Sequence, residues 1–373
     1  MTDTNLKFLF LLKKSGTGYD NTGYEANVPT NVGMQGKAGL SNSANFVAEA
    51  LNRIYGVDTK VVTCVDGNSI DREVYLFKPD VCFIEAIWVT VPKMMELAEL
   101  HPKVLFVIRV HSKTTFLANE GEAVGRIKGY DNIPNVYVSF NNAYTNAEFE
   151  AIDLKPIYLP NIYDVDRPQP MTKFQTVVER IFGRPKEYKK TIDVACFGAI
   201  RPMKNQLLQG VAAIRFAEKY HKKIRFHINA GRCEQKGENV LKNLRALFAG
   251  TEHELVEHMW MPHEKFLELI SKMDIGLQVS LSESFNIVTA DFIAQQIPII
   301  VSDEITWAAD EAKVETSDSE KVADLMNEFL QAPKIIVSEN IKALETYNQA
   351  AIAEWGYFIE DLPNYKDTGG YRD

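Results

Sequence analysis

The chain has no apolar run long enough to cross a membrane. Its longest apolar runs, at residues 8–12 and 297–301, have the length of β-strands, whereas a spanning helix needs about 20 apolar residues. No basic segment followed by a long apolar one opens the sequence, so no secretory signal is predicted. The four cysteines lie far apart and match neither zinc-ligand spacing nor a disulfide framework. We therefore predict a cytoplasmic protein with buried, reduced thiols.

Charge is unevenly distributed along the chain. The net charge of −9 includes a basic block, residues 167–250, with 18 basic and 6 acidic side chains, followed by an acidic segment, residues 251–373, with 8 basic and 24 acidic side chains. A block of net charge +12 indicates attraction for a polyanion or for nucleotide phosphates. Alternatively, these charges are solvated helix faces that the acidic C-terminal third balances.

Strand-like and helix-like segments alternate through the whole chain. Buried strands are predicted in the first half at residues 7–12, 59–65, 81–87, 104–110, 136–140 and 157–160, with an amphipathic helix at 42–54 among the helices between them. The strands are almost continuously apolar, which is typical of parallel strands covered on both faces. The pattern predicts a doubly wound α/β domain over residues 1–165.

A second domain of the same kind is predicted over residues 171–340. The polar, proline-bearing segment 164–170 has the composition of a linker. After it, strands are predicted at 192–197, 224–230, 254–261, 275–279 and 297–302, and helices at 205–220, 238–248, 264–273 and 285–296. The last helix, within about 341–373, is predicted to return to the first domain. Ligands of such sheets bind at the carboxyl ends of the strands.

The segment from Ser280 to Asp291 carries the clearest chemical signal. A buried strand ends near Ser280, a loop presents Glu283, and a helix is predicted to begin near Ser284. Because the first turn of a helix directs free N–H groups and a positive dipole end outward, this point suits a phosphate or a sugar hydroxyl. If this helix included Glu283, the side chains of Glu283 and Asp291 would lie roughly 80° apart when viewed down the helix axis.

Residues 254–302 resemble the donor-binding half of the GT-B glycosyltransferases, in particular the large retaining family whose signature is two acids separated by seven residues. The resemblance implies two facing Rossmann-like domains with a cleft between them, and a nucleotide-sugar donor such as a UDP-sugar. It also implies that Glu283 contacts the donor sugar hydroxyls and Asp291 the nucleotide ribose. The backbone of Ser284, Phe285 and Asn286 would approach the sugar and diphosphate. Asp291 replaces the usual glutamate of this signature, and Asn286 the usual glycine.

Residues 196–205 are similar to the segment of that family in which an arginine and a lysine bind the donor diphosphate. Gly198 and Lys204 match the pattern, whereas Ala199 stands where the family arginine usually follows the glycine. Arg201 would then take the arginine's role from two residues later. Cations are required at this place, because the leaving nucleotide diphosphate develops negative charge. Without the resemblance, these would be two surface cations at a helix start.

In the first domain, His111 follows a buried strand directly and resembles the family's active-site histidine, which lies beside the transferred sugar. Gly33, Gly36 and Gly39, with Lys37 among them, follow the first strand. They resemble the family's flexible loop over the diphosphate and acceptor, although such glycines also occur in ordinary long loops. The polar segment 15–35 is predicted to be an acceptor loop.

The amino-acid sequence at residues 68–72, 83–86, 109–112 and 116–121 resembles that of a subgroup of these enzymes encoded by tailed bacteriophages. The leading prediction is therefore a metal-independent retaining transferase that modifies a 5-hydroxymethylpyrimidine in phage DNA. No Asp-x-Asp pair follows a strand of the second domain, and no His/Cys group has ligand spacing. The candidate DNA contacts are basic side chains outside the diphosphate motif: Arg184, Lys186, Lys189, Lys190, Lys222, Lys223 and Arg225.

Other functions are compatible with the same sequence. The acceptor could be a small molecule, a lipid-linked glycan or a protein. Two different kinds of protein also remain: a non-catalytic nucleotide-sugar-binding module, which Ala199 and Asp291 favour, and a sugar-nucleotide epimerase of similar architecture.

Overall fold

The computed structural model describes residues 6–14, 38–163 and 189–367. The chain divides into two compact units: unit 1 comprises Met1–Asp164 and Asn348–Asp373, and unit 2 comprises Val165–Tyr347. Helix α13 (Pro333–Asp367) begins in unit 2 and ends in unit 1. The predicted linker, 164–170, lies outside the described residues.

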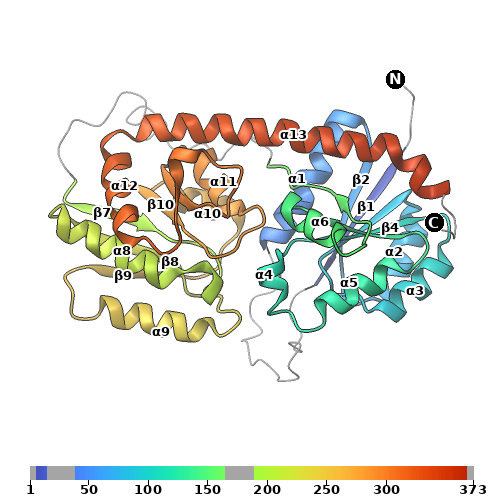
Figure 1. Ribbon diagram of the computed structural model, residues 1–373, viewed down its shortest axis with the longest axis horizontal. Helices are drawn as coiled ribbons and strands as arrows, with labels where there is room; N and C mark the ends of the chain where they lie inside the picture. Colours follow the sequence, from blue (N-terminus) through green and yellow to red (C-terminus); the bar gives the residue numbers. More distant parts are fainter. Residues whose placement is uncertain (1–5, 15–37, 164–188, 368–373) are drawn as a thin grey trace. The chain divides into compact units, whose positions relative to one another are not determined.

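Unit 1 contains a six-stranded sheet in which every pairing is parallel (Figure 1). Its strands are β1 (Lys7–Lys13), β2 (Asp58–Cys64), β3 (Val81–Glu85), β4 (Leu105–Val110), β5 (Val136–Phe140) and β6 (Ile157–Tyr158). They lie in the order β2-β1-β3-β4-β5-β6. The order reverses direction between β1 and β3, which is the switch point where doubly wound sheets bind ligands.

The helices of unit 1 connect these parallel strands. They are α1 (Ala38–Tyr55), α2 (Ser69–Phe77), α3 (Val91–Leu100), α4 (Thr114–Leu117), α5 (Ala123–Asp131) and α6 (Ala143–Glu150). The amphipathic helix predicted at 42–54 is present but starts earlier. Gly39 therefore lies in the first turn of α1, and its prediction as part of a flexible loop is wrong. Gly33, Gly36 and the predicted acceptor loop, 15–35, lie outside the described residues.

Unit 2 contains a second six-stranded, fully parallel sheet. Its strands are β7 (Thr191–Ala195), β8 (Lys223–Asn229), β9 (Glu254–His258), β10 (Ile275–Gln278), β11 (Ile299–Ser302) and β12 (Lys313–Val314), in the order β12-β11-β10-β7-β8-β9. This is the strand order of dinucleotide-binding domains, and its switch point lies between β7 and β10. The chain segments that carry the predicted donor motifs follow these two strands.

The described helical segments that lie wholly within unit 2 are η1 (Pro202–Lys204), α8 (Gln206–Lys219), α9 (Gly237–Phe248), α10 (His263–Ile270), α11 (Ile287–Ala294), η2 (Asp310–Ala312) and α12 (Ser319–Gln331). Within the described parts of both units, no helix combines the length and apolarity needed to cross a membrane. Cys64, Cys82 and Cys196 are buried as predicted, whereas Cys233 is half-buried.

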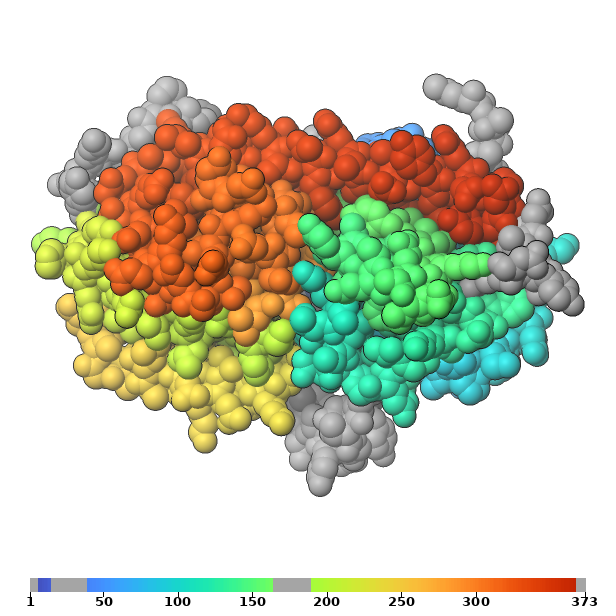
Figure 2. Space-filling view, viewed as in Figure 1, coloured from blue at the N-terminus to red at the C-terminus, as the bar shows by residue number. Residues whose placement is uncertain are grey.

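The C-terminal part of α13 completes the core of unit 1. Trp355 is fully buried and its ring packs edge-on against Phe83 of β3, with centroids 5.4 Å apart. Phe358 contacts both Phe8 and Phe83. Tyr55 of α1 donates a hydrogen bond to the Ile352 carbonyl (2.7 Å). In the space-filling view, α13 residues, drawn in red, contribute to the surface of each unit (Figure 2). The C-terminal part of the last helix is therefore an integral part of unit 1.

Gly276 of β10 is a position where the sheet of unit 2 accepts no side chain. A Cβ there would lie 2.7 Å from two ring carbons of Phe292 in α11. Overpacking of this kind typically costs about 1–3 kcal/mol, so we expect Gly276→Ala to lower the free energy of unfolding by that amount in urea titrations. Gly125→Ala is the control, because no atom lies within 4 Å of a Cβ at that position. Equal stability of the two variants would contradict the prediction.

Candidate functional site

The segments that follow β7 and β10 are tied together at the switch point of unit 2. Leu281 donates its backbone N–H to the Met203 carbonyl (2.9 Å). Gln278 donates its side-chain amide to the Phe197 carbonyl (2.8 Å), and Gln209 of α8 accepts from the Val279 N–H (3.0 Å). These bonds fix the two predicted donor motifs against each other at the carboxyl ends of the strands.

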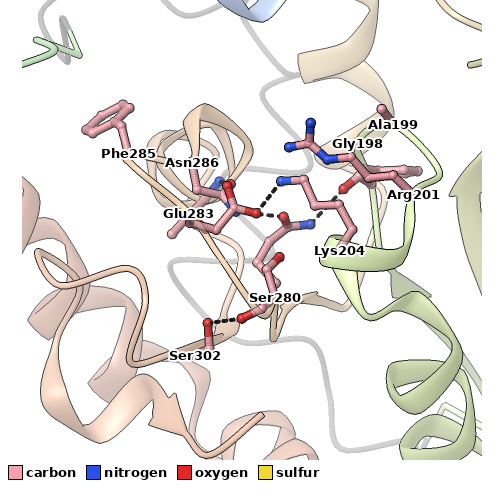
Figure 3. A network of polar contacts seen from close by, with 12 residues as sticks. Gly198, Ala199, Arg201, Lys204, Ser280, Glu283, Phe285, Asn286 and Ser302 are labelled. Carbon is pink, nitrogen blue, oxygen red and sulfur yellow. Dashed lines mark hydrogen bonds and ion pairs between the residues drawn. The ribbon is translucent and has the colours of Figure 1, made fainter. Parts of the chain in front are cut away.

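Lys204 and Glu283 form a buried ion pair between these two segments (Figure 3). Their side chains are only 9% and 7% exposed. Burial lowers the pKa of Lys204, and the nearby Arg201 lowers it further, while Glu283 opposes both effects. The pair places one cation and one carboxylate where a nucleotide-diphosphate sugar is expected to lie.

Arg201 lies beside Lys204, and Figure 3 shows its guanidinium directed to the same side as the lysine amine. It forms an ion pair with Glu234 (3.7 Å). Gly198 has a φ of 117°, which favours glycine, and Asn229 accepts a hydrogen bond from its N–H (2.9 Å). Gly198, Arg201 and Lys204, all predicted from the sequence, thus lie close together in the segment that joins β7 to α8.

Helix α11 begins at Ile287, three residues later than the predicted start near Ser284. Asn286 is its N-cap, with a left-handed φ of 62°, and its side chain accepts from the Thr289 N–H (3.0 Å). Asparagine adopts this conformation more readily than other residues with a side chain. Asn286 therefore fits a position where the resembled family usually has glycine, and it adds a cap.

The two acids of the signature have different partners. Glu283 precedes α11, so the angle of roughly 80° calculated for a continuous helix does not apply. Asp291 lies within α11, is almost fully buried, and contacts His263 at the start of α10 (2.7 Å from Oδ1 to Nε2). The sequence alone did not indicate His263.

The side chain of Phe285 packs in the interior of unit 2. Its ring is buried and stacks on Trp307 with centroids 5.2 Å apart, and its carbonyl accepts a hydrogen bond from the Trp307 indole (2.7 Å). Ser284, its neighbour, is half-buried. The Phe285 side chain therefore belongs to the interior of unit 2, and the ligand contact expected of its backbone stays a prediction.

In unit 1, His111 follows β4 and is held by a buried carboxylate that sequence reasoning missed. Glu85, the last residue of β3, is fully buried and contacts His111 Nε2 (2.5 Å) and Arg109 Nη1 (2.7 Å). The signal was present in the sequence, because Glu85 is the last and Arg109 the second-last residue of two otherwise apolar strands. In the sheet they are direct neighbours.

Many cations of the basic block have acidic partners within unit 2. Lys189 binds Asp193 and Asp274, and Arg225 binds Asp193. Arg215 pairs with Glu320, Lys219 with Glu320 and Asp324, and Arg245 with Glu257. These contacts favour the alternative in which the acidic C-terminal third balances much of the block. Arg184 and Lys186 lie outside the described residues.

Comparison with known proteins identifies the fold. No protein-family model matches the chain, and no curated protein matches its sequence. The N-terminal domain of trehalose-6-phosphate phosphatase from Candida albicans is similar in structure, with a TM-score of 0.67, 11% identity and coverage of 96% of this chain and 97% of that one.

Two synthases are also similar. A UDP-forming α,α-trehalose-phosphate synthase from Burkholderia vietnamiensis has a TM-score of 0.58 at 14% identity, covering 80% of this chain and 78% of that one. A trehalose-6-phosphate synthase studied for glycosyl transfer with retention has a TM-score of 0.55 at 12% identity, covering 96% and 93%. At these identities the likeness establishes the fold, and it confirms the prediction of two doubly wound parallel domains of the GT-B class.

Proposed function

We propose that this protein is a retaining glycosyltransferase that moves a sugar from a nucleotide-diphosphate donor to an acceptor hydroxyl. The buried Lys204–Glu283 pair at the switch point of unit 2 carries the proposal. A buried charge pair is expensive to desolvate and is weak evidence of stabilisation. At the ligand-binding edge of the sheet, the Lys204 ammonium suits the diphosphate of a nucleotide sugar, and the Glu283 carboxylate suits the sugar hydroxyls.

The chemistry follows from the charges around this pair. Lys204 and Arg201 would contact the diphosphate and stabilise the negative charge that develops as the sugar leaves. The N-terminus of α11 adds a positive dipole end at the same edge. Glu283 would accept hydrogen bonds from sugar hydroxyls and hold the sugar in a reactive orientation. Asp291, with His263, would bind the nucleotide ribose.

The names of the similar proteins support the same reaction. One is a UDP-forming synthase, and another was studied for glycosyl transfer with retention. We accordingly propose a UDP-sugar donor. As predicted from the sequence, we also propose a metal-independent reaction in the cytoplasm. The residues at the switch point of unit 2 would bind this donor.

The direct test is a panel of UDP-, GDP-, ADP- and TDP-sugars incubated with the protein, with nucleotide release measured in the presence and absence of EDTA. We expect release from one class of donor, undiminished by EDTA. Donor binding without turnover would favour the non-catalytic module, and sugar inversion without release would favour the epimerase. If EDTA abolishes nucleotide release and magnesium or manganese restores it, the prediction of metal independence is wrong.

Arg201→Ala is expected to weaken donor binding and to lower turnover on the order of 10²-fold, because one preorganised cation is removed from the leaving group. Steady-state kinetics with the preferred donor would measure this effect. Arg245→Ala is the matched control, since Arg245 pairs with Glu257 on the surface of unit 2. A silent Arg201→Ala variant would show that another cation acts on the diphosphate.

The acceptor proposed from the sequence is a 5-hydroxymethylpyrimidine in DNA. Lys190 and Lys223 support it, because both are exposed and are joined through the Lys223 N–H and the Lys190 carbonyl (2.9 Å). Mass spectrometry of nucleosides from hydroxymethylated DNA would detect the transferred sugar. A parallel reaction with small acceptors, including sugar phosphates, tests the alternative. Transfer to small acceptors alone would reject DNA.

A further inference from the structure

Glu85 is a buried carboxylate that the proposed donor chemistry does not use. It ends β3, beside the switch point of the unit 1 sheet, and its side chain has no exposed surface. The next residue, Ala86, has a left-handed φ of 70°, so the strand ends abruptly after Glu85. Because of its burial, the carboxylate reaches a substrate only through another side chain.

Arg109 holds one oxygen of this carboxylate. Its Nη1 donates to Glu85 Oε1 (2.7 Å) and its Nη2 donates to Asn161 Oδ1 (3.1 Å). The guanidinium also lies over the ring of Trp355, 5.2 Å from its centroid. Three contacts from three different parts of unit 1 thus fix the arginine, and the arginine fixes the rotation of the Glu85 carboxylate.

His111 contacts the other oxygen. Burial raises the pKa of Glu85, but Arg109 and His111 outweigh this effect and the pKa is lowered. The carboxylate is therefore ionised near neutral pH and only accepts hydrogen bonds. Since His111 Nε2 lies 2.5 Å from Oε2, Nε2 must carry the hydrogen. Nδ1, at 3.3 Å from Asn141 Nδ2, is then the nitrogen that accepts a hydrogen bond whenever the ring is neutral.

We propose that Glu85, anchored by Arg109, is a positioning residue that fixes the tautomer and orientation of His111 for glycosyl transfer. This inference rests on the proposed function, because it takes His111 as a residue of the transfer site. The hydrogen stays on Nε2, and Nδ1 faces away from the carboxylate as a hydrogen-bond acceptor. A carboxylate that orients a histidine in this way acts through its partner.

A purely structural role for Glu85, neutralising the buried Arg109, makes a different prediction. In Glu85→Gln the single amide oxygen is needed by Arg109, so the amide N–H groups face His111 Nε2. The ring must then accept at Nε2 and carry its hydrogen on Nδ1. A structural role requires only that the variant remains folded, whereas a positioning role requires that the tautomer changes and turnover falls.

The experiment combines NMR of ¹⁵N-histidine-labelled full-length protein with steady-state kinetics. In the wild type we expect an Nε2–H tautomer for His111, assigned by loss of its signals in His111→Gln. In Glu85→Gln we expect the Nδ1–H tautomer and a kcat about 10- to 100-fold lower, a loss of the size found when the partners that orient metal-binding histidines are removed. KM for the donor should change less.

Asp71→Asn is the matched control, because Asp71 pairs with His101 Nε2 (2.8 Å) elsewhere in unit 1. It should shift the signals of His101 and leave both His111 and turnover unchanged. An Nδ1–H tautomer in the wild type would overturn the proposal even if Glu85→Gln did not fold. An unchanged kcat in folded Glu85→Gln would also overturn it. Absence of transfer by the wild type with every donor would instead reject the proposed function, while the wild-type tautomer would still test the geometry.

Discussion

Glu283→Ala is expected to reduce glycosyl transfer on the order of 10²- to 10³-fold, the loss typical when one preorganised electrostatic partner of a transition state is removed. The variant loses the carboxylate that would orient the donor sugar. It also leaves Lys204, whose side chain is 9% exposed, without its partner. Steady-state kinetics with the preferred donor would measure the loss, and circular dichroism would verify the fold.

The matched control for this variant is Glu257→Gln. Glu257 also belongs to an ion pair of unit 2, with Arg245, but that pair is solvent-exposed and contributes little. The turnover of Glu257→Gln should stay at the wild-type level. Near-native turnover in folded Glu283→Ala would remove Glu283 from the site.

Arg109→Met is expected to destabilise unit 1 by about 3–5 kcal/mol, the range observed when one partner of a buried ion pair is removed. Glu85 would remain as a buried charge with its arginine lost, and Asn161 would lose its donor. Urea unfolding monitored by circular dichroism and tryptophan fluorescence would measure the change. Trp355 lies under the guanidinium, so its emission reports on this part of unit 1.

Lys60→Met provides the comparison. Lys60 pairs with Glu73 at 3.4 Å, and its side chain is 42% exposed, so solvent screens the interaction. We expect a much smaller loss of stability than in Arg109→Met. Similar losses in the two variants would show that the buried pair contributes no more than a surface one.

The fold was largely predictable, because hydrophobic periodicity is a local property. Almost continuously apolar segments such as residues 81–85 and 105–110 are typical of buried strands of a parallel sheet. Element ends were less predictable. The strand expected to reach residue 87 ends at Glu85, where Ala86 adopts a left-handed φ, and α1 begins early enough to include Gly39. Such ends depend on tertiary contacts rather than on local pattern.

The candidate site was predictable where the sequence carries a motif. Lys204 and Glu283 were each assigned to the donor, and the structure brings them into contact although 79 positions separate them. The partners of these residues were not predictable. His263 binds Asp291 only because α10 and α11 pack together, and a lone histidine at a helix start carries no such signal.

Unit 1 is assembled from two segments that lie on either side of unit 2 in the sequence, since α13 supplies Trp355 and Phe358 to a core built on Phe8 and Phe83. Domains of multidomain proteins generally fold in order as the ribosome synthesises them, the N-terminal one first. In this protein the core of unit 1 is completed only after unit 2 has been synthesised, although most of unit 1 is made first. Residues 1–164 are made before unit 2 but lack two of their buried aromatic rings until residues 348–373 have been made. Unit 2, which lies between these segments in the sequence, is synthesised before the first unit can close its core, so a nascent chain exposes the Phe83 side of the first sheet while unit 2 is being made.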